Sequence, residues 1–86
     1  MPPKQPVKLS EAKILIYLSE VANPFKYKTM ISVKLDIDYI YLNRIMSQME
    51  AKHWIKKMKS DIKNRVFYEL TMGAPLRLAK QIMENS

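Results

Sequence analysis

The stretch LDIDYIYLNRIMSQMEAKHWI, residues 35–55, decides the fold of this chain. Asp38 is a residue type favoured at a helix N-cap, and apolar residues recur at helical spacing after it. We therefore expect a helix over residues 39–52 that begins at the Asp38 cap. Its inward-facing stripe would consist of Leu42, Ile45, Met46 and Met49.

A shorter helix is predicted immediately before this one. The segment KTMISVKL, residues 28–35, places Ile31 and Leu35 on one helical face. Only the three residues Asp-Ile-Asp separate it from the longer helix. Two helices joined by so tight a turn form a helix-turn-helix.

The remaining elements complete a recognisable order. A first helix, with Ser10 as its N-cap, is expected to end at the Asn-Pro pair 23–24, and a short strand is expected over residues 25–27. Residues 54–58 and 65–70 read as two strands joined by a polar connection. A last helix would start at Thr71 or shortly after and run to about Glu84. The order helix-strand-helix-helix-strand-strand-helix is that of an α+β, mostly helical winged helix-turn-helix, whose antiparallel hairpin we call the wing.

Residues 35–55 also resemble a known family pattern. MarR-type, PadR-type and small archaeal winged-helix regulators carry Leu-Gly-Ile-Ser, a variable helix and Leu-Glu-x-Lys-Gly-Leu-Ile in this region. The ending ELTMG, residues 69–73, is similar to their Leu-Thr-x-x-Gly junction after the wing. Asp36 and His53 stand where these regulators have Gly. Both positions commonly need a left-handed backbone, which Asp and His tolerate better than most residues do.

Size and composition indicate one domain. The chain has 86 residues, 48% of them hydrophobic, and it contains no Cys. Residues 1–8 are Pro-rich, with Lys4 and Lys8, and we expect a flexible arm there, followed by the winged helix-turn-helix domain over residues 9–86. We find no signal-peptide pattern and no apolar run long enough to span a bilayer, so we expect a cytoplasmic, nucleoid-associated protein without a membrane partner.

A net charge of +7 favours a polyanionic partner, and double-stranded DNA is the one we expect. Basic residues gather in the wing, where they would neutralise phosphates; the alternative is a loop that only aids solubility. The predicted DNA contacts of the wing are Lys57, Lys59, Lys63, Asn64 and Arg65. Further backbone contacts are expected at the start of the second helix, from Lys26, Lys28 and Thr29, the hydroxyl of Thr29 also being a candidate helix cap.

The outward face of the helix over residues 39–52 suits reading of bases in the major groove. Arg pairs with guanine, and Asn or Gln with adenine. The predicted contacts are Tyr39, Ile40, Tyr41, Asn43, Arg44, Ser47 and Gln48. We expect the Tyr39 ring to pack at the border of the core, with its hydroxyl near a phosphate. Asp36 and Asp38 bring negative charge to this end and weigh against DNA.

Enzymatic chemistry is disfavoured. One His, one Gly and no Cys exclude most nucleophile-base pairs, zinc sites and Gly-rich phosphate loops. We therefore expect no catalytic residue, no metal site and no cofactor.

The last helix carries more apolar residues than one packing stripe needs. The family resemblance implies a homodimer through Leu76, Leu78, Ala79, Ile82 and Met83. The alternative is that this helix folds back onto the first helix of its own chain. The expected function is that of a dimeric transcription regulator. A DNA-binding adaptor in segregation or compaction and a protein-interaction module that uses Ile40 and Tyr41 are the alternatives.

Overall fold

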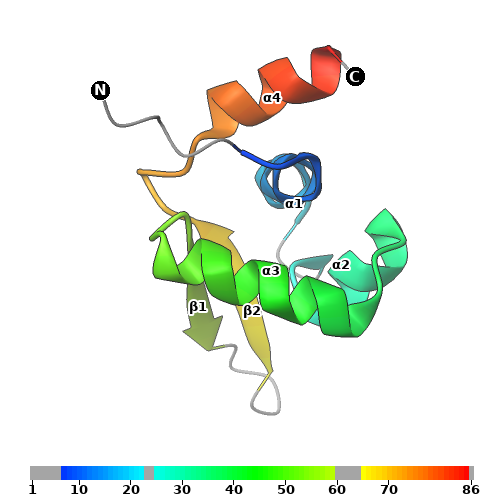
Figure 1. The fold of residues 1–86 in the computed structure, drawn as a ribbon. Helices are drawn as coiled ribbons and strands as arrows, with labels where there is room; N and C mark the ends of the chain where they lie inside the picture. The colour runs from blue at the N-terminus through cyan, green and yellow to red at the C-terminus, as the bar shows by residue number, and fades with distance from the viewer. Residues whose placement is uncertain (1–6, 23–24, 60–64, 86) are drawn as a thin grey trace.

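The fold is a set of helices packed around the base of a two-stranded hairpin (Figure 1). The structure is a computed structural model that describes residues 7–22, 25–59 and 65–85. Over these residues the elements are α1 (Leu9–Glu20), α2 (Lys28–Leu35), α3 (Tyr39–Ala51), β1 (Ile55–Lys59), β2 (Val66–Leu70) and α4 (Leu76–Glu84). The predicted winged helix-turn-helix is confirmed. The strand expected over residues 25–27 is not formed.

The N-cap of helix α1 lies two residues earlier than predicted. Lys8, and not Ser10, is the N-cap, and its backbone N–H donates to Glu11 Oε1 at 2.9 Å. Val7 is only 6% exposed, so residues 7 and 8 belong to the packed structure and not to the expected arm, whose residues 1–6 lie outside the described ones. The helix ends at Glu20, before the Asn-Pro pair, which is also outside them.

The turn between α2 and α3 has the predicted chemistry. Asp36 adopts a left-handed backbone (φ 54°), and Ile37 N–H donates to the carbonyl of Ser32 at 3.0 Å. Oδ2 of Asp38 then accepts from the backbone N–H groups of Ile40 and Tyr41, at 3.1 and 3.2 Å. Two of the four N–H groups left open at the start of α3 are thereby satisfied.

The wing hairpin is antiparallel, and its register pairs Ile55 with Leu70, Lys57 with Tyr68 and Lys59 with Val66. Tyr68 N–H also donates to the carbonyl of Lys26 at 3.1 Å, so the segment before α2 adds one strand-like bond. It forms no strand because Tyr27 is already the N-cap of α2 and the chain turns into the helix after that single bond.

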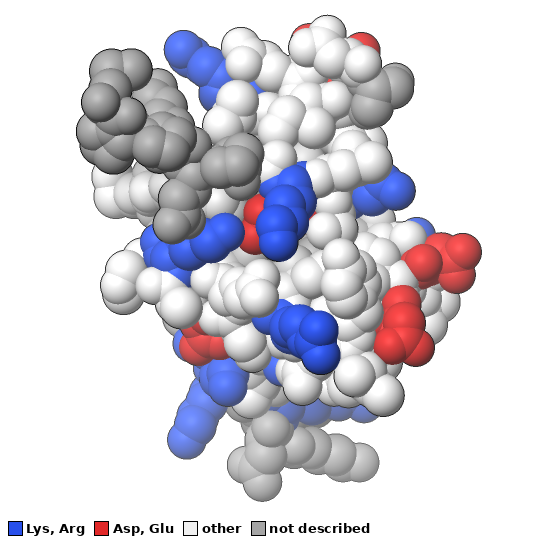
Figure 2. All heavy atoms as spheres, in the orientation of Figure 1, with Lys and Arg blue, Asp and Glu red and all other residues white. Residues whose placement is uncertain are grey.

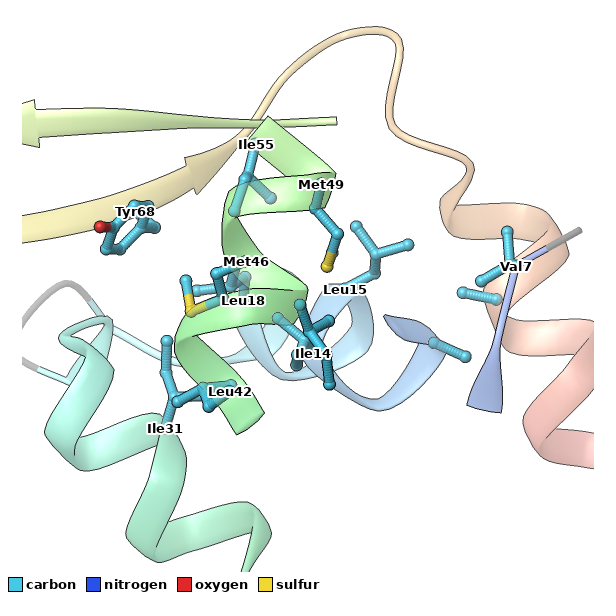
Figure 3. Close-up of a cluster of buried hydrophobic side chains, with 13 residues drawn as sticks. Val7, Ile14, Leu15, Leu18, Ile31, Leu42, Met46, Met49, Ile55 and Tyr68 are labelled. Carbon is cyan, nitrogen blue, oxygen red and sulfur yellow. The ribbon is translucent and has the colours of Figure 1, made fainter. Parts of the chain in front are cut away.

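The core lies where α1, α2, α3 and the base of the wing meet (Figure 3). Helix α3 contributes the whole predicted stripe, because all four of its members are at most 4% exposed. The other large buried apolar side chains are Ile14, Leu15, Leu18, Ile31, Ile55 and Tyr68. This packing fixes which face of α3 points outward.

Helix α4 starts at Leu76, five residues after the earliest predicted start at Thr71. Residues 71–75 form a turn instead, in which Ala74 N–H donates to the carbonyl of Thr71 at 3.2 Å, and Pro75 takes the N-cap position. The helix packs across α1, above the rest of the domain in Figure 1. None of the helices in the described ranges has the length and apolar content that a bilayer crossing requires.

Candidate nucleic-acid interface

The outward face of α3 is exposed over its full length. Ile40 is 76% exposed, and Asn43, Arg44, Ser47 and Gln48 are exposed as well. Tyr39 is 46% exposed, so the expectation that its ring packs at the border of the core is wrong. The buried stripe begins only at Leu42, and the first turn of α3 lies beyond it. The structure therefore brings the predicted reading residues together on one surface.

Lys28, the first residue of α2, connects two parts of this surface. Its ammonium group donates a hydrogen bond to Oδ1 of Asn43 on α3 and lies 5.4 Å from the centre of the Tyr68 ring on β2. Thr29 is exposed within the first turn of α2. It does not cap the helix as expected, because Tyr27 occupies the N-cap position and no side chain makes a cap bond there.

The wing places its lysines on two faces. Successive side chains of a strand point to opposite sides, so Lys57 and Lys59 share the face of Tyr68, whereas Lys56 lies on the other face, opposite Glu69. Arg65, at the start of the returning strand, lies with its guanidinium carbon 5.4 Å from the centre of the Tyr27 ring. The predicted contacts Lys63 and Asn64 lie outside the described residues.

A basic groove joins these parts, and we define it by three cations and three tyrosines. It has a volume of about 650 Å³ and is open to solvent along the starts of α2 and α3 and the wing. Its polar lining consists chiefly of Lys28, Lys57, Arg65, Tyr27, Tyr39 and Tyr68. Burial raises the pKa of the Tyr68 phenol, against the opposing influence of the nearby Lys57 charge. The phenol is therefore neutral at physiological pH, and no negative charge of its own offsets the three cations.

Charge is unevenly distributed over the face drawn in Figure 2. Basic side chains are spread across this face, including its lower end over the wing, whereas acidic side chains gather mainly at the edge where α2 meets α3. Asp36 and Asp38 are both exposed at that connection. This acidic connection would repel an anionic ligand.

The fold is shared with MarR. The crystal structure of wild-type MarR in its apo form, from E. coli, matches with a TM-score of 0.73 and 18% sequence identity, over 87% of this chain and 54% of that one. A mutant of ZitR from Lactococcus lactis matches with a TM-score of 0.71 and 21% identity, over 98% of this chain and 57% of that one. This chain therefore spans little more than half the length of either protein.

MarR and ZitR are winged-helix proteins of the MarR family, so the predicted resemblance is confirmed at the level of the fold. No protein-family model and no curated protein sequence matches the chain.

The residues expected at a MarR-like dimer interface lie against α1 of the same chain. Ala79 is fully buried there, and the apolar side chains around it pack partly against the core. These are Leu76, Leu78, Ile82 and Met83. This is the fold-back arrangement that the sequence left open, and the homodimer stays a prediction.

One interaction behind the interface was not predicted. Glu11 of α1 is fully buried, and its Oε2 accepts from Lys52 Nζ at 3.0 Å. The same ammonium group lies 4.4 Å from the centre of the Trp54 ring. Lys52 caps the C-terminal end of α3, so this contact ties that end of α3 to α1. The only signal in the sequence is that Glu11 stands three residues after the Lys8 cap, as in a capping box.

The described residues contain no group of three or more His, Cys, Asp or Glu that could hold a metal ion.

Proposed function

We propose that this chain binds double-stranded DNA as a transcription regulator, with α3 in the major groove and the wing on the phosphate backbone or in the minor groove. The observation that carries the proposal is the basic groove, which lies beside the exposed reading face of α3. The fold shared with the regulators MarR and ZitR supports it.

The two surfaces have complementary tasks in this proposal. The groove cations Lys28, Lys57 and Arg65 neutralise phosphates and set the register of the protein on the duplex. The exposed side chains of α3 then meet base edges, because the major groove admits a helix. The negative charge of Asp36 and Asp38 lies at the connection between α2 and α3, so it disfavours a close approach of that connection to the phosphates.

The salt dependence of binding tests the proposal directly. The binding constant for a labelled duplex is measured by fluorescence anisotropy at several salt concentrations, for the wild type and two single variants. Lys57→Gln removes a charge from the groove, and Lys56→Gln removes the same charge from the opposite face of the same strand. We expect Lys57→Gln to weaken binding and to reduce the slope of log K against log salt by about 0.9, the value for one phosphate contact.

Lys56→Gln is the matched control, and it should change binding much less. Equal effects of the two variants would mean that DNA binding depends only on the net charge of the protein and not on the cations of the groove. Absence of saturable binding at low salt would overturn the DNA proposal.

A second candidate, a protein-interaction module, rests on exposed apolar side chains at the other end of the same surface. Val33 of α2 and Ile40 of α3 are 74% and 76% exposed and lie near the acidic α2–α3 connection. Such a surface suits a partner with an apolar centre and a basic rim. Substitution of Ile40 by Ser should abolish binding of that partner, whereas Lys57→Gln should leave it intact.

We further propose that the active form is a homodimer, in which the solvent-facing sides of α4 from two chains meet. A two-fold pair would present its two α3 helices to half-sites about one DNA turn apart. Analytical ultracentrifugation of the free protein and of the DNA complex tests this. The same DNA-binding surface would also serve an adaptor protein in DNA segregation or compaction. Spreading of many copies of the chain along a long duplex would reveal that role.

A further inference from the structure

The side-chain amide of Asn43 is held by Lys28, and this contact determines what the amide can offer to a ligand. Asn43 lies on the outward face of α3 and is exposed, whereas Lys28 is half-buried at the start of α2. The Lys28 ammonium group donates to Oδ1 of Asn43. Lys28 is itself positioned by its contact with the Tyr68 ring, 5.4 Å from the ring centre.

The orientation of the amide follows from the chemistry of lysine. An ammonium group carries three donors and no acceptor, so the atom of Asn43 that faces it must be the carbonyl oxygen. The amide nitrogen of Asn43, with its two N–H donors, is then the part left to meet a ligand. Lys28 takes one of the two lone pairs of that oxygen, and its positive charge disfavours the approach of a second N–H donor, so Asn43 offers chiefly its own donors.

We propose that Lys28 makes Asn43 a donor-only reader that selects a keto base, guanine foremost and thymine second, at one position in the major groove. This inference rests on the proposed DNA binding. An asparagine whose amide is unoccupied pairs with adenine through one donor and one acceptor, the pairing that the sequence alone predicts. Guanine instead presents two acceptors, N7 and O6, and thymine presents O4, whereas adenine and cytosine present amino groups. Lys28 acts here as a positioning residue.

Selection from a library of randomised duplexes, followed by sequencing of the bound pool, tests the inference. For the wild type we expect at least about fivefold enrichment of keto bases at one position, the lower end of the discrimination of a well-placed side chain. Lys28→Met keeps an unbranched side chain at this position but frees the Asn43 acceptor, and it should shift that position to adenine. Lys57→Met is the matched control, because it removes one charge from the same groove without touching Asn43.

The control should weaken binding to all sequences and leave the base preference unchanged. A further variant, Asn43→Asp, alters an exposed side chain and presents acceptors only, so it should move the preference from keto bases to cytosine. This variant tests the inference even if Lys28→Met fails to fold, which its thermal melting curve will show.

Several results would overturn the inference. They are adenine at that position in the wild type, the same base preference in Lys28→Met as in Lys57→Met, or a keto preference that survives Asn43→Asp. Saturable binding with no base preference at any position would overturn the inference while leaving the proposed DNA binding standing. No saturable binding by the wild type would remove the proposed function and the inference with it.

Discussion

The carboxylate of Glu11 accepts a hydrogen bond from the ammonium group of Lys52, with 3.0 Å between Oε2 and Nζ. The two side chains are 1% and 25% exposed, so the carboxylate is buried while the ammonium group reaches solvent. Helix α1 belongs to the core, and Lys52 lies at the end of α3. The contact therefore fixes α3 to the body of the domain at the end opposite the Asp38 cap.

The two partners should respond unequally to substitution. Lys52→Met leaves a buried carboxylate without its countercharge, and we expect a loss of about 2–3 kcal/mol in the free energy of unfolding. Glu11→Gln leaves a Lys52 that water can reach and an amide oxygen that can still accept from the Lys8 N–H, so a loss of about 1 kcal/mol is expected. Urea denaturation at neutral pH measures both.

Lys13→Met removes an exposed lysine of α1 and serves as the control, with an expected change within about 0.5 kcal/mol. The double variant Glu11→Gln with Lys52→Met should be more stable than Lys52→Met alone, since no unpaired buried charge remains. Equal losses in the two single variants would contradict this account of the pair.

The sequence predicted the helix-turn-helix well because its signals are local. The Asp38 cap and the stripe from Leu42 to Met49 follow from the spacing of residues within one helix, and the structure confirms both. The strand over residues 25–27 and the start of α4 were wrong because they depend on competing neighbours. Tyr27 already caps α2, so the chain turns into that helix. Residues 71–75 form a turn, so α4 begins only after its N-cap Pro75.

The candidate interface was predicted residue by residue but not as an arrangement. Lys28, Lys57 and Arg65 were each named from local charge, yet their convergence on one groove depends on how α2 and the wing pack together. The contact of Lys28 with Asn43 spans 15 positions, and that of Lys52 with Glu11 spans 41. Helical or strand periodicity carries no information over such separations.

The Asp38 cap allows its structural and electrostatic effects to be separated. Asp38→Ala removes the acceptor for the Ile40 and Tyr41 N–H groups and should cost about 1 kcal/mol of stability. Asp38→Asn keeps an acceptor and should stay within a few tenths of a kcal/mol of the wild type. Urea denaturation gives these values.

The same Asp38→Asn variant should bind DNA more tightly than the wild type at low salt, because a negative charge near the duplex is lost. Anisotropy titrations of the two proteins at matched salt measure the difference. Weaker binding by Asp38→Asn would argue against an approach of this end of α3 to DNA.

His53 adopts a left-handed backbone with φ 62°, and its side chain is exposed. A side chain is disfavoured in this conformation, whereas Gly adopts it freely. His53→Gly should therefore raise the free energy of unfolding by about 0.5–1 kcal/mol. His53→Val, a β-branched residue at the same φ, should lower it by about 1 kcal/mol or more. Thermal unfolding of the three proteins distinguishes them, and a His53→Gly variant less stable than the wild type would contradict the prediction.

Stability at high pH should depend on Tyr68. Burial raises the pKa of its phenol above the ordinary value of 10.0, so between that value and the folded pKa the native state holds a proton that the unfolded state has lost. The stability that this group contributes is fully present below about pH 10 and declines as the pH rises above it, by at most about 1.4 kcal/mol per pH unit for one proton.

Tyr68→Phe keeps the buried ring and removes the titrating hydroxyl, so its stability should fall less steeply than that of the wild type over this range. Urea denaturation of both proteins from about pH 8 to about pH 11 measures the two slopes. Tyr17 provides a comparison, because burial also raises its pKa while its hydroxyl donates to the Phe25 carbonyl at 2.8 Å. Tyr17→Phe should therefore lower stability already at neutral pH and keep the alkaline decline that Tyr68 causes. Identical alkaline slopes for the wild type and Tyr68→Phe would show that the decline has another origin.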